Sequence, residues 1–111
     1  MVDPLGNALE KYMDLLSTRE KLVASNIANA DTPGYKTRDV DFQTQFQNLL
    51  DGGQAQASEV TGLAVKNDGN NVNIDREAQL LSETAMRFSV ASNLLRDQFK
   101  TLRMAIEEGK S

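Results

Sequence analysis

The chain has 111 residues, with 12 lysines and arginines against 16 aspartates and glutamates, and it contains no cysteine, histidine or tryptophan. This composition excludes a disulfide framework, a thiolate metal site and any histidine-based centre, and no basic stripe with aromatic residues points to nucleic-acid binding. Because only 5% of the residues are aromatic, we expect one small domain whose core is too thin to order the isolated chain fully.

The first predicted element is a helix over residues 3–30. Asp3 suits its N-cap, and Pro4 suits the first helical position, where no backbone N–H is needed. Apolar side chains recur at steps of four and three, the 3.5-residue period of a coiled-coil seam: Leu5, Leu9, Tyr12, Leu16 and Val23. Arg19 and Asn26 continue this line, and buried polar seam residues set register and partner choice in coiled coils.

A turn motif is predicted where this helix ends. Thr32 precedes Pro33 and is pushed towards extended geometry, while Pro33 and Gly34 suit the two central positions of a type II turn. By turn chemistry alone, an ordinary helix terminator would look the same. The motif consists of Ser25, Asn26, Ile27, Ala28, Asn29, Ala30, Asp31, Thr32, Pro33, Gly34 and Tyr35.

Residues 31–74 are predicted to form a turn, a short helix and an irregular connection. The short helix is expected within residues 39–50, because Phe42, Phe46, Leu49 and Leu50 fall on one helical face. Gly52 and Gly53 would end it, residues 54–58 are expected to be flexible, and residues 60–65 are expected to be briefly extended. The run at residues 68–71 is a turn signal.

The last predicted element is a helix over residues 75–108, with Asp75 as its cap and Gly109 as its stop. Its apolar residues again step by four and three: Leu81, Ala85, Phe88, Leu95, Phe99, Leu102 and Ile106, with Ser92 on the same line. We therefore expect a mainly α fold in which two long terminal helices pack as a coiled-coil-like hairpin. Since the middle is too poor in apolar residues to cover both stripes, we expect these seam residues to serve assembly with other copies.

No catalytic, cofactor-binding or metal-binding residues are predicted, and we expect the chain not to be an enzyme. The Asp/Asn-rich run before the last helix is not a calcium loop, because placing Gly69 at the required glycine puts Ala64 and Lys66 at ligand positions. Residues 1–7 lack the basic head and apolar stretch of a cleavable signal peptide, and no run is long and apolar enough to insert into a membrane.

Two separated segments carry a family resemblance. The run SNIANADTPGYKTRDVDF, residues 25–42, resembles the signature of bacterial flagellar basal-body rod and hook-family proteins, and residues 68–77, DGNNVNIDRE, are similar to a second patch in a subunit of the proximal rod. The segment at residues 52–67 matches nothing comparable and looks short for the family.

The resemblance implies a single rod-type domain over residues 1–111, a structural subunit of the rod that assembles through its terminal helices into a tubular, helically arranged drive shaft needed for motility. It also implies three kinds of partner: other copies and other rod proteins, a FliE-like adaptor, and the export gate at the rod base. The location would be the rod on the periplasmic side of the inner membrane, reached by type III export without a cleaved signal peptide. Another rod subunit of the same family, or a small cytoplasmic helical adaptor or export chaperone that dimerises through its seams, is the alternative.

Overall fold

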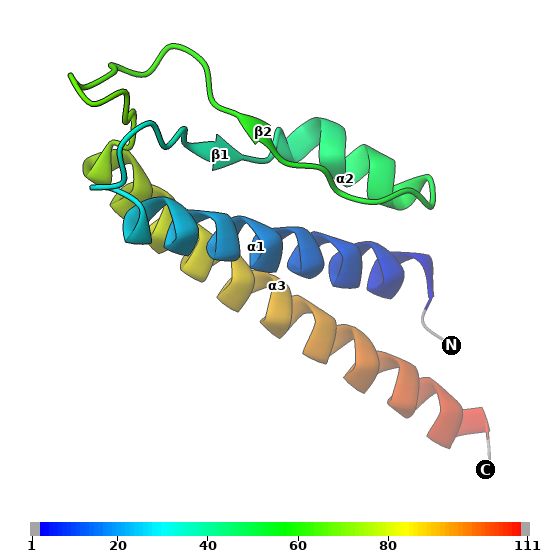
Figure 1. The fold of residues 1–111 in the computed structure, drawn as a ribbon. Coiled ribbons are helices and arrows are strands. Elements are labelled where there is room, and N and C mark those ends of the chain that lie inside the picture. The colour runs from blue at the N-terminus through cyan, green and yellow to red at the C-terminus, as the bar shows by residue number, and fades with distance from the viewer. Residues whose placement is uncertain (1–2, 110–111) are drawn as a thin grey trace.

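The computed structural model describes residues 3–109, and within them the chain forms three α-helices and one two-stranded sheet. In chain order these are α1 (Pro4–Ala28), β1 (Arg38–Asp39), α2 (Phe42–Leu50), β2 (Ser58–Glu59) and α3 (Ile74–Gly109). The molecule is elongated, with extents of 70 × 25 × 17 Å and a radius of gyration of 18.2 Å, against about 13 Å for a globular domain of this length. The expected mainly helical fold is confirmed (Figure 1).

Helix α1 begins as its sequence predicts. The Asp3 carboxylate accepts a hydrogen bond from the Gly6 backbone N–H at 2.7 Å, and Pro4 occupies the first helical position. At the other end Asn29 is the C-cap, and its N–H bonds to the Ser25 carbonyl at 3.1 Å. The helix therefore ends slightly earlier than the predicted residue 30, and its last turn leads directly into the turn motif.

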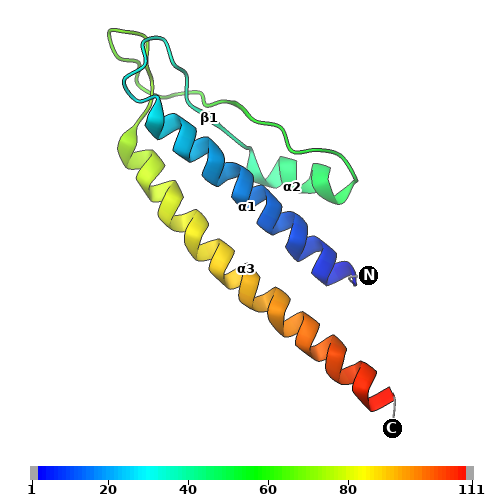
Figure 2. The same cartoon turned by 60° about the horizontal axis from the view of Figure 1, so that its bottom comes forward.

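Helices α1 and α3 lie side by side and run antiparallel (Figures 1 and 2). Asn26, near the end of α1, bonds to Glu77 near the start of α3, while the Asp3 carboxylate accepts a hydrogen bond from Gln98. Beyond Gln98, α3 continues past the start of α1, and every residue from 99 to 109 is exposed. We call residues 99–109 the overhang. The predicted hairpin of long terminal helices is thus confirmed, with unequal arms.

The N-cap of α3 differs from the prediction. The helix begins at Ile74, and the Asn73 side chain accepts the Arg76 backbone N–H at 3.1 Å. Asp75 lies inside the first turn, where its charge still suits the helix dipole. Asn and Asp cap about equally well, so composition alone does not decide between neighbouring candidates.

The core is small and lies mainly under α1. Leu15, Leu16 and Val23 of α1 are almost fully buried, together with Val40 and Val72 of the connecting segment. On α3 the buried residues recur every seven positions but are polar or small: Glu77, Thr84 and Ala91. The intramolecular contact line of α3 is therefore not the apolar stripe that the sequence predicts.

The connecting segment departs from the prediction in two places. Helix α2 starts at Phe42 rather than at residue 39, because Asp39 belongs to β1 and is turned into the core. The extended segment expected at residues 60–65 is wrong as placed: the strand is β2, at residues 58–59, where Ser58 lies opposite Asp39 in an antiparallel pair. The position of a strand this short is determined by the strand with which it pairs, and not by the β-propensity of its own residues.

Helix α2 packs across α1 through aromatic side chains. The ring of Tyr12 meets those of Phe42 and Phe46 edge-on, with centroids 5.3 and 5.8 Å apart. The Lys11 ammonium donates to the Leu49 carbonyl at 2.9 Å, and this carbonyl at the end of α2 also accepts the Gly52 N–H at 3.1 Å. These contacts hold the middle of the chain against the first helix.

Candidate functional site

The turn after α1 has the geometry that its sequence predicts. The Tyr35 N–H bonds to the Thr32 carbonyl at 3.2 Å, closing a four-residue turn. Gly34 stands at its third position with φ +77°, the left-handed value that a type II turn requires there. The chain leaves α1 through this turn and doubles back along it.

The two segments that carry the family resemblance meet in space. The Gly34 N–H donates to the Asp68 carbonyl at 2.9 Å, and the buried Asn70 amide donates to the carbonyls of Asn29 and Thr32 at 2.8 and 2.9 Å. A Cβ on Gly69 would lie 3.3 Å from the Gly34 Cα, so the two backbones are in close contact. The loop before α3 therefore clamps the turn after α1.

Asn26 connects the three parts of this junction and is 1% exposed. Its amide nitrogen donates to the Arg38 carbonyl at 2.9 Å and to the Glu77 carboxylate. Its oxygen accepts from the Tyr35 hydroxyl at 2.9 Å and from the Arg38 N–H at 3.1 Å. Both amide protons and both lone pairs of the side chain are thus used, within one chain, linking α1, the segment after the turn, and α3.

A chain of charges extends from Asn26 along the junction. Glu77, fully buried, pairs with Arg76 at 2.6 Å, Arg76 pairs with Asp39 at 2.7 Å, and Asp39 pairs with Arg19 of α1 at 3.0 Å. Two positive and two negative groups alternate, so the cluster is neutral as a whole. Buried charges of this kind are tolerated only when every member is paired.

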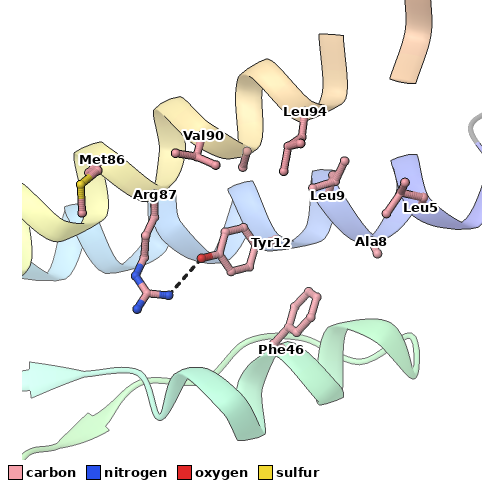
Figure 3. Close-up of a pocket in the computed structure, with 10 residues that line it drawn as sticks. Leu5, Ala8, Leu9, Tyr12, Phe46, Met86, Arg87, Val90 and Leu94 are labelled. Carbon is pink, nitrogen blue, oxygen red and sulfur yellow. Dashed lines mark hydrogen bonds between the residues drawn. The ribbon is translucent and has the colours of Figure 1, made fainter. Parts of the chain in front are cut away.

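An apolar groove runs along the outside of α1, between α2 and α3 (Figure 3). Its volume is about 440 Å³, and apart from Arg87 and the Tyr12 hydroxyl the side chains that line it are apolar. The Tyr12 hydroxyl accepts from Arg87 at 3.1 Å, which raises the pKa of Arg87. We call this the apolar groove; it is lined by Leu5, Ala8, Leu9, Tyr12, Phe46, Met86, Arg87, Val90, Ala91 and Leu94.

The predicted seam residues are divided between core and surface. In α1, Leu16 and Val23 are buried, Leu9 and Tyr12 are half-buried, and Leu5 is 56% exposed. In α3 only Leu95 and Ser92 are half-buried, and the exposed members of the stripe are Leu81, Ala85, Phe88, Phe99, Leu102 and Ile106. That these side chains contact neighbouring molecules stays a prediction.

The turn motif is likewise divided. Asn26 is buried, and Asn29, Ala30 and Tyr35 are half-buried. The exposed members are Ser25, Ile27, Ala28, Asp31, Thr32, Pro33 and Gly34. Tyr35 and Phe42 hold the connecting segment on α1 through the bond to Asn26 and the contact with Tyr12.

Comparison with known proteins points to one family. Residues 13–36, the second half of α1 and its turn, match the family model described as "Flagella basal body rod protein". The chain is 26% identical to the flagellar basal body rod protein FlgB of Yersinia ruckeri, over 98% of this chain and 100% of that protein. It is 27% identical to FlgB of Escherichia coli K12, over 98% and 99%, and 29% identical to FlgB of Borrelia hermsii, over 87% and 91%.

The chain belongs to the flagellar basal body rod family. It is a structural subunit of the basal body rod, and the relatives that identify it are rod proteins and not enzymes. Membership in the family implies assembly with other rod subunits. The alignment to the Yersinia ruckeri relative spans 137 positions against the 111 residues of this chain, so the rod-family relative carries additional residues.

Within residues 3–109 of this rod-family chain, no cluster of three or more acidic, histidine or cysteine side chains could hold a metal ion. In the same range no helix combines the length and the apolar character that crossing a membrane requires.

Sequence reasoning missed two parts of this rod-family site. The first is the pairing of Asp39, Arg76 and Glu77, for which Arg19 on the predicted seam was the only signal. The second is the α3 wall of the apolar groove. Its residues Met86, Val90 and Leu94 recur every fourth residue, on a line beside the predicted apolar stripe of α3. A spacing of four residues is itself a helical signal. Because a helix has 3.6 residues per turn, however, residues spaced by four lie on a line that winds gradually around the helix and does not stay on one face.

The ion-pair chain yields a stability prediction. Replacing Arg76 by Gln should lower the free energy of unfolding by about 2–4 kcal/mol, because Glu77 and Asp39 lose a charged partner while they remain buried. Urea denaturation followed by circular dichroism measures this. The matched control is Arg87→Gln, since Arg87 pairs with Glu83 at an exposed position and such pairs contribute less than about 1 kcal/mol. Equal effects of the two changes would contradict the role given to Arg76.

Proposed function

We propose that this rod subunit is a proximal-rod component, most like FlgB, and that it builds the tubular rod by packing its two terminal helices against neighbouring subunits. The observation that carries this proposal is the long apolar surface of α3. Exposed apolar side chains occur along its whole length, and those on the overhang lie beyond any contact with α1. Apolar surface of this extent on a small chain marks an interaction surface.

The fold suits such a role because the junction that fixes the two helices lies at one end of the molecule and the exposed apolar surfaces lie towards the other. The junction of α1, the turn and α3 is held by buried hydrogen bonds and ion pairs, so it fixes the angle and register of the two helices. The opposite end presents the apolar groove and the overhang, which are different surfaces. Contacts between different surfaces of identical subunits produce open helical assemblies when the rotation does not close.

Further parts of the proposal rest on the family resemblance. Residues 1–111 would act as one rod-type domain. Its neighbours would include other rod proteins, a FliE-like adaptor and the export gate at the rod base. The subunit would lie on the periplasmic side of the inner membrane, and it would be exported without loss of a signal peptide.

The proposal predicts a strong effect of charges on the overhang stripe. Replacing Phe99 and Ile106 together by Asp should leave thermal unfolding of the purified chain unchanged, because both side chains are exposed and distant from the core. The same variant should be missing from purified basal bodies, and cells that carry it in place of the wild-type chain should lose motility, because two carboxylates would have to be desolvated at the contact.

The matched control adds the same two charges to the other side of the overhang, as Thr101→Asp with Ala105→Asp. These positions are also exposed and lie on average about a third of a helical turn from the centre of the stripe. We expect this control to enter basal bodies and to support motility. Normal incorporation of the Phe99 and Ile106 variant, or equal loss in both variants, would contradict assembly through this stripe.

A further inference from the structure

Two apolar features of the described chain have no partner within it, the apolar groove and the stripe on the overhang. In the groove, Met86 is 64% exposed, and Val90 and Leu94 are each more than half exposed. On the overhang, Phe99, Leu102 and Ile106 follow the i, i+3, i+7 spacing that places side chains on one helical face. Each feature is suited to bury apolar area against the other.

The overhang cannot occupy the groove of its own molecule. One wall of the groove is α3 itself, from Met86 to Leu94, and α3 runs on as a single helix into the overhang (Figure 2). Folding back would require breaking α3 between Leu94 and Phe99. The helix contains no proline or glycine there, and neither the sequence nor the structure provides a break.

The two features also agree in length. The stripe from Phe99 to Ile106 covers eight residues, and so does the floor of the groove from Leu5 to Tyr12. At 1.5 Å per residue each is about 10 Å long. Two turns of helix therefore present three apolar side chains to a groove two turns long.

We infer that the overhang of one copy lies in the apolar groove of a second copy of this chain, head to tail. The inference rests on the proposed assembly through the terminal helices and specifies which surfaces meet. For copies that point the same way, the groove centre at Val90 and the overhang centre at Arg103 set an offset of about 20 Å along α3. Since each copy then keeps a free groove at one end and a free overhang at the other, the contact repeats along the assembly.

Cysteine cross-linking tests this contact, because the natural chain has no cysteine. The variant carries Val90→Cys and Leu102→Cys, and basal bodies purified from cells that produce it are oxidised briefly. We expect disulfide-linked dimers and longer products of this chain, at least about tenfold above the control, since a disulfide requires Cβ atoms about 4 Å apart. The control pairs Val90→Cys with Thr101→Cys, which places the second thiol on the other face of the overhang.

A charge pair provides a second test that does not depend on oxidation. Val90→Lys and Leu102→Glu, introduced singly, should each reduce the amount of the chain in basal bodies at least about tenfold, because each places an unpaired charge in an apolar contact. The double variant should recover to within a few-fold of wild type, since every contact then joins a lysine to a glutamate. No recovery beyond the product of the single effects would overturn the inference.

The outcomes separate this contact from the proposed function. If the cysteine variant enters basal bodies but Cys-linked products of the chain do not exceed the control, the overhang–groove contact is wrong and the rod assignment stands. If the thiol at position 90 links to a different rod protein, the overhang–groove contact between copies is also wrong and the rod assignment again stands. If the wild-type chain itself is missing from purified basal bodies, the proposed function is what fails.

Discussion

Replacing Asn26 by Leu is expected to lower the free energy of unfolding by about 3–4 kcal/mol, because several groups at the junction lose a hydrogen bond at once. Leu fills a similar volume but offers no donor or acceptor. The Arg38 N–H and carbonyl and the Tyr35 hydroxyl, which are partly buried, and one buried oxygen of Glu77 would each lose a partner. Urea denaturation of the full chain, followed by circular dichroism at 222 nm, measures the loss.

The matched control is Asn93→Leu. Asn93 lies on an exposed position of α3, so the same exchange there should change the free energy of unfolding by no more than about 0.5 kcal/mol. Asn26→Asp provides a second comparison, because it keeps the acceptors but sets a carboxylate against Glu77. We expect it to destabilise as well, and a stable Asn26→Leu variant would show that Asn26 does not hold the junction.

Replacing Gly34 by Val is expected to abolish motility while leaving helix content nearly intact. Gly34 adopts φ +77°, and a β-branched residue is a clear outlier in this region. Holding Val there costs about 1–3 kcal/mol, so the turn should relax to another conformation and send the following segment in a different direction. The bond from the Gly34 N–H to Asp68 would then be lost, and α1 and α3 would lose their common clamp.

The comparison of Gly34→Val with Gly34→Asn isolates the backbone effect. A Cβ at position 34 would meet nothing within 4 Å, so the Cβ atom that both replacements add has room. Asn tolerates the left-handed conformation far better than Val does, and we expect it to keep most of the motility. Swimming assays and far-ultraviolet circular dichroism are the measurements. A motile Val variant, or an immobile Asn variant with normal helix content, would contradict this account of the turn.

Much of the fold could be read from local signals. Asp3 and Pro4 marked the start of α1, Pro33 and Gly34 marked the turn, and the aromatic pair Phe42 and Phe46 marked the inner face of α2. Each of these signals acts within a few residues of the chain, through a cap, a fixed φ angle or a helical face. The structure confirms them because little tertiary contact competes with them in so thin a fold.

The strand positions and the cap of α3 could not be read in this way. Residues 60–65 have β-branched and apolar side chains, yet the strand lies at Ser58 and Glu59 because that is where β1 passes. Asp75 was the predicted cap, yet the Asn73 side chain accepts the Arg76 N–H at the start of α3, and Asn and Asp cap about equally well. The strand position was decided by a pairing partner distant in the sequence.

The sequence by itself determined that two long helices flank a tight turn, that apolar stripes run along both helices, and that the turn carries the signature of the rod family. Only the tertiary structure decided which stripe of α3 faces inwards. Periodicity ranks residues by hydrophobicity, and it therefore selected the Leu81 and Phe88 line, whereas α3 packs on α1 through Glu77, Thr84 and Ala91. Glu77 can lie inside because Asn26 and Arg76 satisfy its carboxylate. Arg76 is its neighbour in the chain, but Asn26 is 51 residues away and meets Glu77 only in the folded chain.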